Sequence, residues 1–412
     1  MRNVAGYRCY RCGNFLPVSH GIDSRGCPSC ADVAPSNLHV AYRVEVTLDV
    51  TPAGPAFPPS LWRYASDLPF NALEAVSLGE GLTPFLPADR LGAKLGVTRL
   101  FIKNEGCNPT WSHKDRFSTV AVTAARQTGA AVVATSSTGN AGASLAAYAA
   151  KAGLSCVVAT LASSAGPMLA QIRKYGARVV PFEKKSDRWT FLDEGVERFG
   201  WFATSPYRHP VVGSHPIGIE GYKTIAFEIV EQMHGSVPDW CVLPVCYGDA
   251  LAGIWLGFRE LLNRGKIRRL PRLLAAEVHG SLRRALEQQA DRIPDMEATY
   301  DTLAVSVGAT RSTFQALKAL RDTRGAAVSV TNDGLIALQE QVAATEGLFL
   351  ELSSTMPIAA IKTARQQGII EEHETVVAVV TASGLKDVDR SASIGVQRPF
   401  CDVSTALAAL EV

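Results

Sequence analysis

Apolar, β-branched runs alternate with helix-like segments over most of the chain beyond about residue 95. The sequence predicts strands at 99–105, 131–137, 154–160, 177–182, 240–245, 272–278 and 375–381. It predicts helices between them at 113–129, 140–153, 167–175, 220–234 and 250–264. Apolar strands that alternate with helices indicate parallel sheets covered on both faces. We therefore expect an α/β fold with two α/β domains, in which ligands bind at the carboxyl ends of strands.

The bulk composition narrows the choice of partners. The chain has 412 residues, with 41 Lys and Arg against 39 Asp and Glu, and a net charge of +2. This balance argues against a nucleic acid or a membrane surface as the main partner. The sequence contains no run of about 18 apolar residues that would form a transmembrane helix, and its first residues lack the apolar core of a secretory signal. We expect a cytoplasmic protein, with a connecting arm in the proline-rich segment 51–60.

Four cysteines near the start form the pattern C-x2-C-x14-C-x2-C. They are Cys9, Cys12, Cys27 and Cys30. Two CxxC pairs at this separation place four thiolates around one tetrahedral Zn²⁺, and Gly13 and Gly26 suit tight turns beside them. The alternative is a small lobe of reduced cysteines without metal. A redox role is less favoured, because a structural zinc would use all four thiolates. The pattern therefore predicts a structural zinc ribbon.

Five segments beyond the cysteines carry a resemblance to a known family. They are SLGEGLTPFL (77–86), NPTWSHKDR (108–116), SSTGNAGASLAAYAAKAGL (136–154), GIEGYKTIAFEI (218–229) and TASGLKD (381–387). In this order and at these separations they resemble the threonine synthase family, within the fold type II pyridoxal-phosphate (PLP) enzymes. The resemblance runs from roughly residue 60 to 390, and its motifs are specific jointly rather than singly.

The resemblance implies an architecture and a set of partners. The architecture is tryptophan synthase β-like, with two doubly wound parallel-sheet domains and a small zinc ribbon. We expect the zinc ribbon at 1–35, a large PLP-binding domain from 36–122 and 206–412, and a small α/β domain at 123–205. The implied ligands are PLP and a small amino-acid substrate, and the implied assembly is a homodimer.

The lysine of NPTWSHKDR is the central candidate for chemistry. In the family, the lysine of the similar motif NPTGSFKDR holds PLP as a Schiff base, which makes Lys114 the implied catalytic residue. A lysine must lose its proton to attack an aldehyde, and burial beside other cations lowers its pKa. His113 and Arg116 are the neighbouring cations that we expect to contribute. The alternative is a surface lysine at a helix start, where a cation is disfavoured.

The other motifs supply the implied cofactor and substrate contacts. Asn140 is implied to bond the ring hydroxyl, Thr381 the pyridine nitrogen, and the loop 246–250 the phosphate through backbone amides. A hydroxyl at the pyridine nitrogen leaves the ring near neutral, which suits expulsion of a β- or γ-substituent. The predicted cofactor-binding residues are Lys114, His113, Asn140, Cys246, Tyr247, Gly248, Asp249, Ala250 and Thr381. The predicted substrate-binding residues are Ser136, Ser137, Thr138 and Arg208. The alternatives are a plain helix N-cap at SSTGN and a strand-end hydroxyl at Thr381.

Three departures from the family pattern bear on the substrate. Cys246 and Tyr247 replace small residues in the phosphate loop, and Asp249 places an acid near an expected dianion. The family usually has an arginine, a natural phosphate clamp, where Gly218 stands; here the arginine of the similar segment, Arg208, comes about nine residues too early. An insertion, HPVVGSHP, lies between them. Trp111 stands where a glycine is usual, and it either reshapes the pocket or packs outward.

These observations leave three functions open. The first is threonine synthase, which converts O-phospho-L-homoserine and water to L-threonine and phosphate. The second is a related PLP lyase that performs β-elimination or β-replacement on another small hydroxy or phospho amino acid. The third is a binding or regulatory protein without activity, against which Lys114, Asn140 and Thr381 argue. The segments LWRYASDLP, GEGLTP and EGYKT favour the first, and the departures favour the second.

Overall fold

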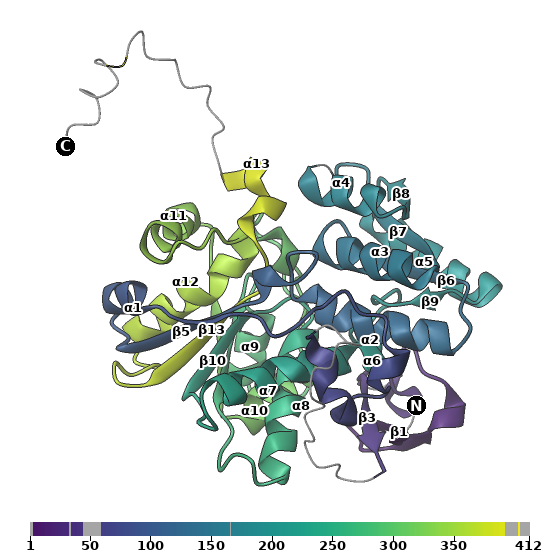
Figure 1. Cartoon of the computed structure of the whole chain (residues 1–412), viewed down its shortest axis with the longest axis horizontal. Helices are drawn as coiled ribbons and strands as arrows, with labels where there is room; N and C mark the ends of the chain where they lie inside the picture. Colours follow the sequence, from purple (N-terminus) through teal and green to yellow (C-terminus); the bar gives the residue numbers. More distant parts are fainter. Residues whose placement is uncertain (1–2, 33, 44–58, 165, 392–402, 404–412) are drawn as a thin grey trace.

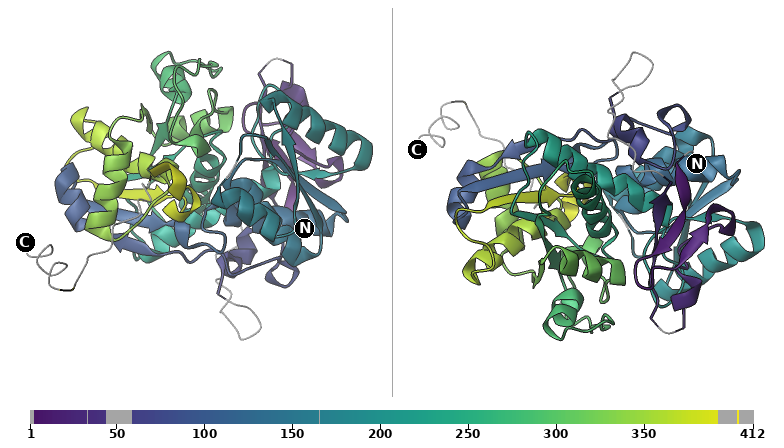
Figure 2. Two further views of the ribbon diagram at one scale, coloured as in Figure 1. Left: turned by 90° about the horizontal axis from the view of Figure 1, so that it is seen from above. Right: turned by 90° about the horizontal axis from the view of Figure 1, so that it is seen from below.

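A computed structural model describes residues 3–32, 34–43, 59–164, 166–391 and Val403. Nearly all of the predicted connecting arm at 51–60 therefore lies outside the described residues. The described chain forms two parallel-sheet units and a small antiparallel module (Figure 1). The larger sheet lies on one side of the molecule, and the smaller parallel sheet lies on the other, beside the N-terminal module (Figure 2).

The larger sheet has the strand order β12-β11-β10-β13-β5-β4. All neighbours are parallel except β4, which runs antiparallel to β5. The strands are β4 (Phe85–Pro87), β5 (Arg99–Asn104), β10 (Trp240–Pro244), β11 (Arg272–Glu277), β12 (Ala326–Ser329) and β13 (Thr375–Val380). Its helices are α1 (Asp89–Leu95), α6 (Pro216–Ile219), α7 (Lys223–Gln232), α8 (Asp249–Asn263), α9 (Ser281–Glu287), α10 (Phe314–Asp322), α11 (Leu335–Glu346), α12 (Leu352–Gln366) and α13 (Val388–Ser391).

The central strands of this sheet are buried on both faces. In β10, Cys241 and Leu243 join a core with α7, α8 and α10, whereas Trp240 and Val242 join a second core with α1, α11 and α12. Successive side chains of a strand point to opposite faces. A strand covered on both sides is therefore apolar at every position, which is the pattern from which the sequence predicted a parallel sheet.

The smaller parallel sheet has the order β8-β7-β6-β9. Its strands are β6 (Val132–Ser136), β7 (Ser155–Leu161), β8 (Arg178–Phe182) and β9 (Phe202–Ala203), and its helices are α2 (Lys114–Gln127), α3 (Asn140–Ala152), α4 (Pro167–Lys174) and α5 (Lys185–Phe199). The N-terminal module pairs β1 (Val4–Cys9) with β2 (Phe15–Pro17) and β3 (Leu38–Tyr42). Its sheet thus extends beyond residue 35. Short 3-10 segments lie at Val18–His20, Pro28–Cys30, Ala72–Glu74, Glu105–Cys107, Glu220–Tyr222, Val305–Val307 and Gly384–Lys386, and a longer one with a kink at Tyr64 spans Leu61–Asp67.

The strands and helices predicted from the sequence are confirmed, with ends that differ by no more than three residues. The predicted helix 220–234 begins as a 3-10 turn, Glu220–Tyr222, and continues as α7. Gly221 lies in that turn, where an added Cβ would stand 1.8 Å from the carbonyl oxygen of Arg116. The close approach of this turn to α2 therefore requires glycine. Helix α5 and the elements from α9 to α12 were not predicted from the sequence.

A network of buried charges joins both parallel-sheet units at the start of α2. The Arg116 guanidinium donates to Glu105 through Nε at 2.7 Å and to Glu228 through Nη1 at 2.6 Å. The Lys103 ammonium donates to the same Glu228 carboxylate at 2.7 Å. Glu228 also accepts the backbone N–H groups of Leu82 and Thr83. The two cations outweigh the effect of burial and hold the pKa of Glu228 below its ordinary value.

Substitution Glu228→Gln tests this network. It leaves Arg116 and Lys103 buried with one counter-charge fewer, and we expect a loss of about 3–5 kcal/mol in the free energy of unfolding. Denaturant titration of wild type and variant at pH 7 measures the loss. Glu231→Gln, in the same helix but in a partly exposed pair with Arg63, is the control, with an expected change of about 0–1 kcal/mol. Equal effects of the two substitutions would contradict the central role of the network.

Candidate active site

A cavity of about 610 Å³ lies where the carboxyl ends of three strands meet the start of α2. Ser136 ends β6, Pro244 ends β10, Thr381 follows β13 and Lys114 begins α2, and all four line the cavity. This is the position that parallel-sheet topology predicts for a ligand. All predicted cofactor and substrate residues line this cavity except Arg208.

The side chain of Lys114 lies in this cavity. Its Nζ is 3.4 Å from the hydroxyl oxygen of Tyr222. Burial lowers the pKa of Lys114 below its ordinary value, while Asp249, Cys246 and Glu351 act in the opposite direction. Desolvation disfavours the charged amine, so the site raises the fraction of Lys114 in the nucleophilic, neutral form.

The predicted decrease in the pKa of Lys114 comes from burial and not from neighbouring cations. Neither His113 nor Arg116 contributes to the shift. Burial, followed by the positive Lys114, lowers the pKa of His113 well below its ordinary value, so this imidazole is neutral at pH 7. The charge of Arg116 is offset by the carboxylates of Glu105 and Glu228. The neutral His113 lines the cavity, with Nδ1 3.3 Å from the carbonyl oxygen of Thr381.

Trp111 packs outward and does not line the cavity. It is 47% exposed, and its φ of 66° lies in the left-handed region. The similar family motif NPTGSFKDR has a glycine at this position. The left-handed conformation accounts for that glycine, because glycine adopts it without steric cost. The backbone N–H of Trp111 donates to the carbonyl of Asn108 at 2.7 Å, and its carbonyl accepts from Ser383 at 3.1 Å, which together hold the turn.

Asn140 and Thr381 are oriented by residues of the large domain. The Asn140 amide nitrogen donates one N–H to the buried Glu351 carboxylate at 2.6 Å, and Ser306 donates to the same carboxylate at 2.5 Å. The Ser354 hydroxyl accepts the backbone N–H of Ala382 at 2.7 Å and lies 2.9 Å from the Thr381 hydroxyl. Either hydroxyl can be the donor in the contact between Ser354 and Thr381. When Ser354 donates, the Thr381 proton is available to a ligand.

The loop after β10 presents backbone donors to the cavity. Gly248 has a φ of 90° and precedes α8, which has no side-chain cap. Among the described residues, no acceptor is bonded to the N–H groups of Tyr247–Asp249. Such groups at a helix N-terminus suit a phosphate. The Asp249 carboxylate is turned to the inserted segment, where it accepts the backbone N–H of Ser214 at 3.1 Å and lies 3.3 Å from Gln315 Nε2.

Several buried polar atoms in the cavity wall have no partner among the described residues. They are Ser136 Oγ, Asn140 Oδ1 and Arg188 Nε. Buried polar atoms are normally hydrogen-bonded, and their concentration here indicates a polar ligand. The amine of Lys114, the amide of Asn140, the hydroxyl of Thr381 and the N–H groups before α8 match the aldehyde, ring and phosphate of PLP. The residues present therefore fit that cofactor.

The structure separates Arg208 from the predicted substrate site. Its guanidinium donates to Asp193 at 2.7 Å and to Glu197 at 2.9 Å, on the outer part of α5. The inserted segment that follows packs against α5 through the rings of His209 and Trp189, whose centroids are 4.3 Å apart. By contrast, Ser136, Ser137 and Thr138 all line the cavity, as expected for a substrate carboxylate site.

Four residues of the cavity wall were not identified from the sequence: Lys185, Arg188, Lys386 and Asp387. Neither was Glu351, the buried carboxylate that accepts from Asn140. Lys386 and Asp387 lie within the motif TASGLKD, and that motif was the available signal. Arg188 and Glu351 lie on or beside helices far along the chain, and only the folded arrangement brings them to the site.

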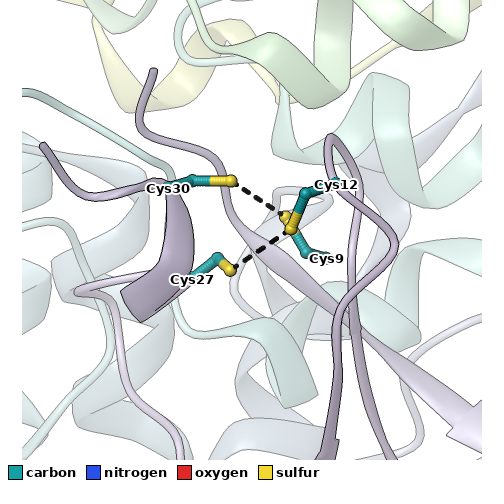
Figure 3. A group of neighbouring side chains, drawn as sticks. All are labelled: Cys9, Cys12, Cys27 and Cys30. Carbon is teal, nitrogen blue, oxygen red and sulfur yellow. Dashed lines mark hydrogen bonds between the residues drawn. The ribbon is translucent and has the colours of Figure 1, made fainter. Parts of the chain in front are cut away.

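The four predicted metal ligands come together in the N-terminal module (Figure 3). The sulfur atoms of Cys9, Cys12, Cys27 and Cys30 all lie within 4.8 Å of one another. Gly13 and Gly26 have φ values of 71° and 81°, which confirms the tight turns predicted beside the cysteine pairs. This geometry fits a four-thiolate zinc site.

Substitution Asp249→Asn tests the electrostatics at Lys114. The Asp249 carboxylate raises the pKa of Lys114. Its removal lowers that pKa further, so the neutral amine persists to lower pH. We expect reaction of the cofactor-free variant with PLP, followed by visible absorbance, to have its pH midpoint shifted to lower pH. Asp389→Asn, which alters another cavity carboxylate, is the control, and an unchanged profile for Asp249→Asn would contradict the assignment.

Known proteins are similar in sequence to most of the chain. Residues 76–382 match the family described as pyridoxal-phosphate dependent enzyme. The threonine synthase of Methanocaldococcus jannaschii is 34% identical over 388 residues, which cover 93% of each chain. The threonine synthase of Mycobacterium tuberculosis is 36% identical over 315 residues, 76% of this chain and 84% of that one.

Solved structures show the same fold. Threonine deaminase isoform 2 of Solanum lycopersicum aligns with a TM-score of 0.63 at 21% identity, over 76% of this chain and 84% of that one. Maize serine racemase aligns with a TM-score of 0.61 at 18% identity, over 79% and 91%. These likenesses confirm the predicted fold type II architecture. The family model and the threonine synthase relatives both match most of the chain. The chain therefore belongs to the threonine synthase family of pyridoxal-phosphate-dependent enzymes.

Proposed function

We propose that the protein is a PLP-dependent threonine synthase, which converts O-phospho-L-homoserine and water to L-threonine and phosphate. The observation that carries the proposal is one cavity that brings the buried Lys114 amine together with Asn140 and Thr381. The likeness to threonine synthases over 93% of the chain supports the same reaction. PLP, when bound, supplies an electron sink for carbanions next to the substrate amine.

Lys114 is the proposed base and proton carrier. Its amine is buried, and the hydroxyl of Tyr222 is its single hydrogen-bond partner among the described residues. A neutral amine accepts a proton from substrate carbon and returns it at a neighbouring carbon. Burial is the main cause that raises the pKa of Tyr222 well above its ordinary value, so this phenol stays protonated beside the lysine.

The remaining residues position ligands. Thr381, whose hydroxyl lies 2.9 Å from that of Ser354, would donate a hydrogen bond to the ring nitrogen, and Asn140 would contact the ring hydroxyl. The N–H groups of the loop 246–250 would hold the cofactor phosphate. Ser136, Ser137 and Thr138 hold the substrate carboxylate at the start of α3, where helix N–H groups favour an anion.

The position of Arg208 favours a second candidate. An arginine bound to Asp193 and Glu197 is not placed to clamp a substrate phosphate. A PLP lyase that performs β-elimination or β-replacement on an amino acid without phosphate has no need of such a clamp. The two candidates differ in the product that forms from O-phospho-L-homoserine.

The direct test is turnover by purified protein. We expect O-phospho-L-homoserine to yield equal amounts of phosphate and L-threonine, and the visible absorbance of bound PLP to disappear in Lys114→Ala. Lys94→Ala, on α1 outside the cavity, is the control and should retain both properties. Cofactor absorbance without release of phosphate would reject threonine synthase and lead to a screen of serine, threonine and phosphoserine for elimination or replacement.

We also propose that the cysteine cluster holds a structural Zn²⁺. The module that it would brace reaches the cavity wall. Asn37 Nδ2 donates to the carbonyl of Ser214 at 2.9 Å, and the N–H of Ser214 donates to Asp249. His215 Nε2 lies 3.1 Å from the carbonyl of Ile22. The homodimer and the cytoplasmic location remain predictions; among the described residues, no helix is long and apolar enough to cross a membrane.

Metal analysis tests the zinc proposal. We expect about one zinc per chain, because four thiolates complete a tetrahedral site. Chelation, or Cys27→Ser, should lower the thermal unfolding midpoint, since metal-binding free energy contributes to folding. Cys107→Ser, which changes an exposed cysteine outside the cluster, should keep both the metal and the midpoint. A metal-free protein with an unchanged midpoint would reject the proposal.

A further inference from the structure

The structure leaves a substrate phosphate without the arginine that the sequence suggested. Arg208 is engaged on the outer part of α5 by Asp193 and Glu197. Position 218, where the family's arginine would align, has no space for a side chain. A Cβ added to Gly218 would lie 2.4 Å from Cε2 of Phe117. Any arginine that binds a second phosphate must therefore come from another element.

Arg188 meets the requirements for that role. It lies in the first turn of α5 and lines the cavity, yet it is only 6% exposed. Its Nε has no hydrogen-bond partner, and no ion pair to it is present among the described residues. A buried guanidinium without an acceptor is costly, and a ligand that brings its own negative charge removes that cost.

The surroundings of Arg188 also favour an anion. Lys185, three residues earlier on the same face of the helix, lines the cavity as well. α5 is a 15-residue helix without a side-chain cap, so its first-turn N–H groups are open to a ligand. Asp187, the acidic residue of this turn, does not line the cavity. A guanidinium and an ammonium therefore line this part of the cavity, and both lie near a helix N-terminus, which favours an anion.

We propose that Arg188, with Lys185 and the first turn of α5, binds the phosphate group of a phosphomonoester amino-acid substrate. This inference rests on the proposed function and assigns its substrate-phosphate site. The guanidinium offers a planar set of donors that matches phosphate oxygens. Arg188 and Tyr247 line the same cavity, so the site shares that cavity with the loop proposed for the cofactor phosphate. The cofactor phosphate has separate donors in that loop.

Substitution Arg188→Gln separates the two phosphates. With substrate, we expect KM for O-phospho-L-homoserine to rise by about tenfold or more, and the inhibition constant of inorganic phosphate to rise in parallel. The affinity of cofactor-free protein for PLP should not change, nor should the absorbance response to L-threonine, which carries no phosphate. Arg188→Lys should recover part of the loss, because it retains the charge.

The control is Arg198→Gln, which changes an exposed arginine in the last turn of the same helix and should leave every constant unchanged. Thermal unfolding of each variant shows whether the fold is kept. Loss of PLP affinity in Arg188→Gln, or an unchanged inhibition constant for phosphate, would overturn the assignment. If wild-type protein does not turn over O-phospho-L-homoserine, the proposed function fails. The phosphate site is tested separately by equilibrium binding of inorganic phosphate, which should be weaker in Arg188→Gln than in wild type.

Discussion

The buried charges around Arg116 are the constraint on which the site depends. Arg116 lies two residues after Lys114, and its guanidinium is held by carboxylates from Glu105 and Glu228. A charge enclosed in protein needs compensation within hydrogen-bonding distance. The turn after β5, the first turn of α2 and α7 are therefore fixed in one arrangement, and that arrangement fixes where the backbone of Lys114 enters the cavity.

Buried polar groups have opposite effects in two parts of the structure. Around Arg116 each donor has an acceptor, which makes the region rigid. In the cavity wall, Arg188 Nε, Asn140 Oδ1 and Ser136 Oγ have none among the described residues. Unpaired buried polar atoms reduce stability, and their location marks the surface that a polar ligand is built to complete. The amine of Lys114 differs from both groups. Burial lowers its pKa, and its hydrogen-bond partner is the hydroxyl of Tyr222 and not a carboxylate.

Much of the fold followed from the sequence because its signals are local. The strands β10 and β13 are buried on both faces and are therefore apolar throughout, so they can be predicted from their own residues alone. The elements between α9 and α12 were not proposed, and neither was α5. The predicted motif residues meet at one cavity because they lie at strand ends or helix starts, which parallel topology brings to one edge.

The sequence by itself determined the chemistry that is available: a lysine after an Asn-Pro turn, an amide and a hydroxyl at strand ends, and four cysteines in two close pairs. Only the tertiary structure decided which charges act on which groups. Arg116 is neutralised and does not tune Lys114, Arg208 is taken by Asp193 and Glu197, and Trp111 points outward. Arg188 gains its place from the packing of α5. Electrostatic effects depend on distance and burial, and neither can be read from separation along the chain.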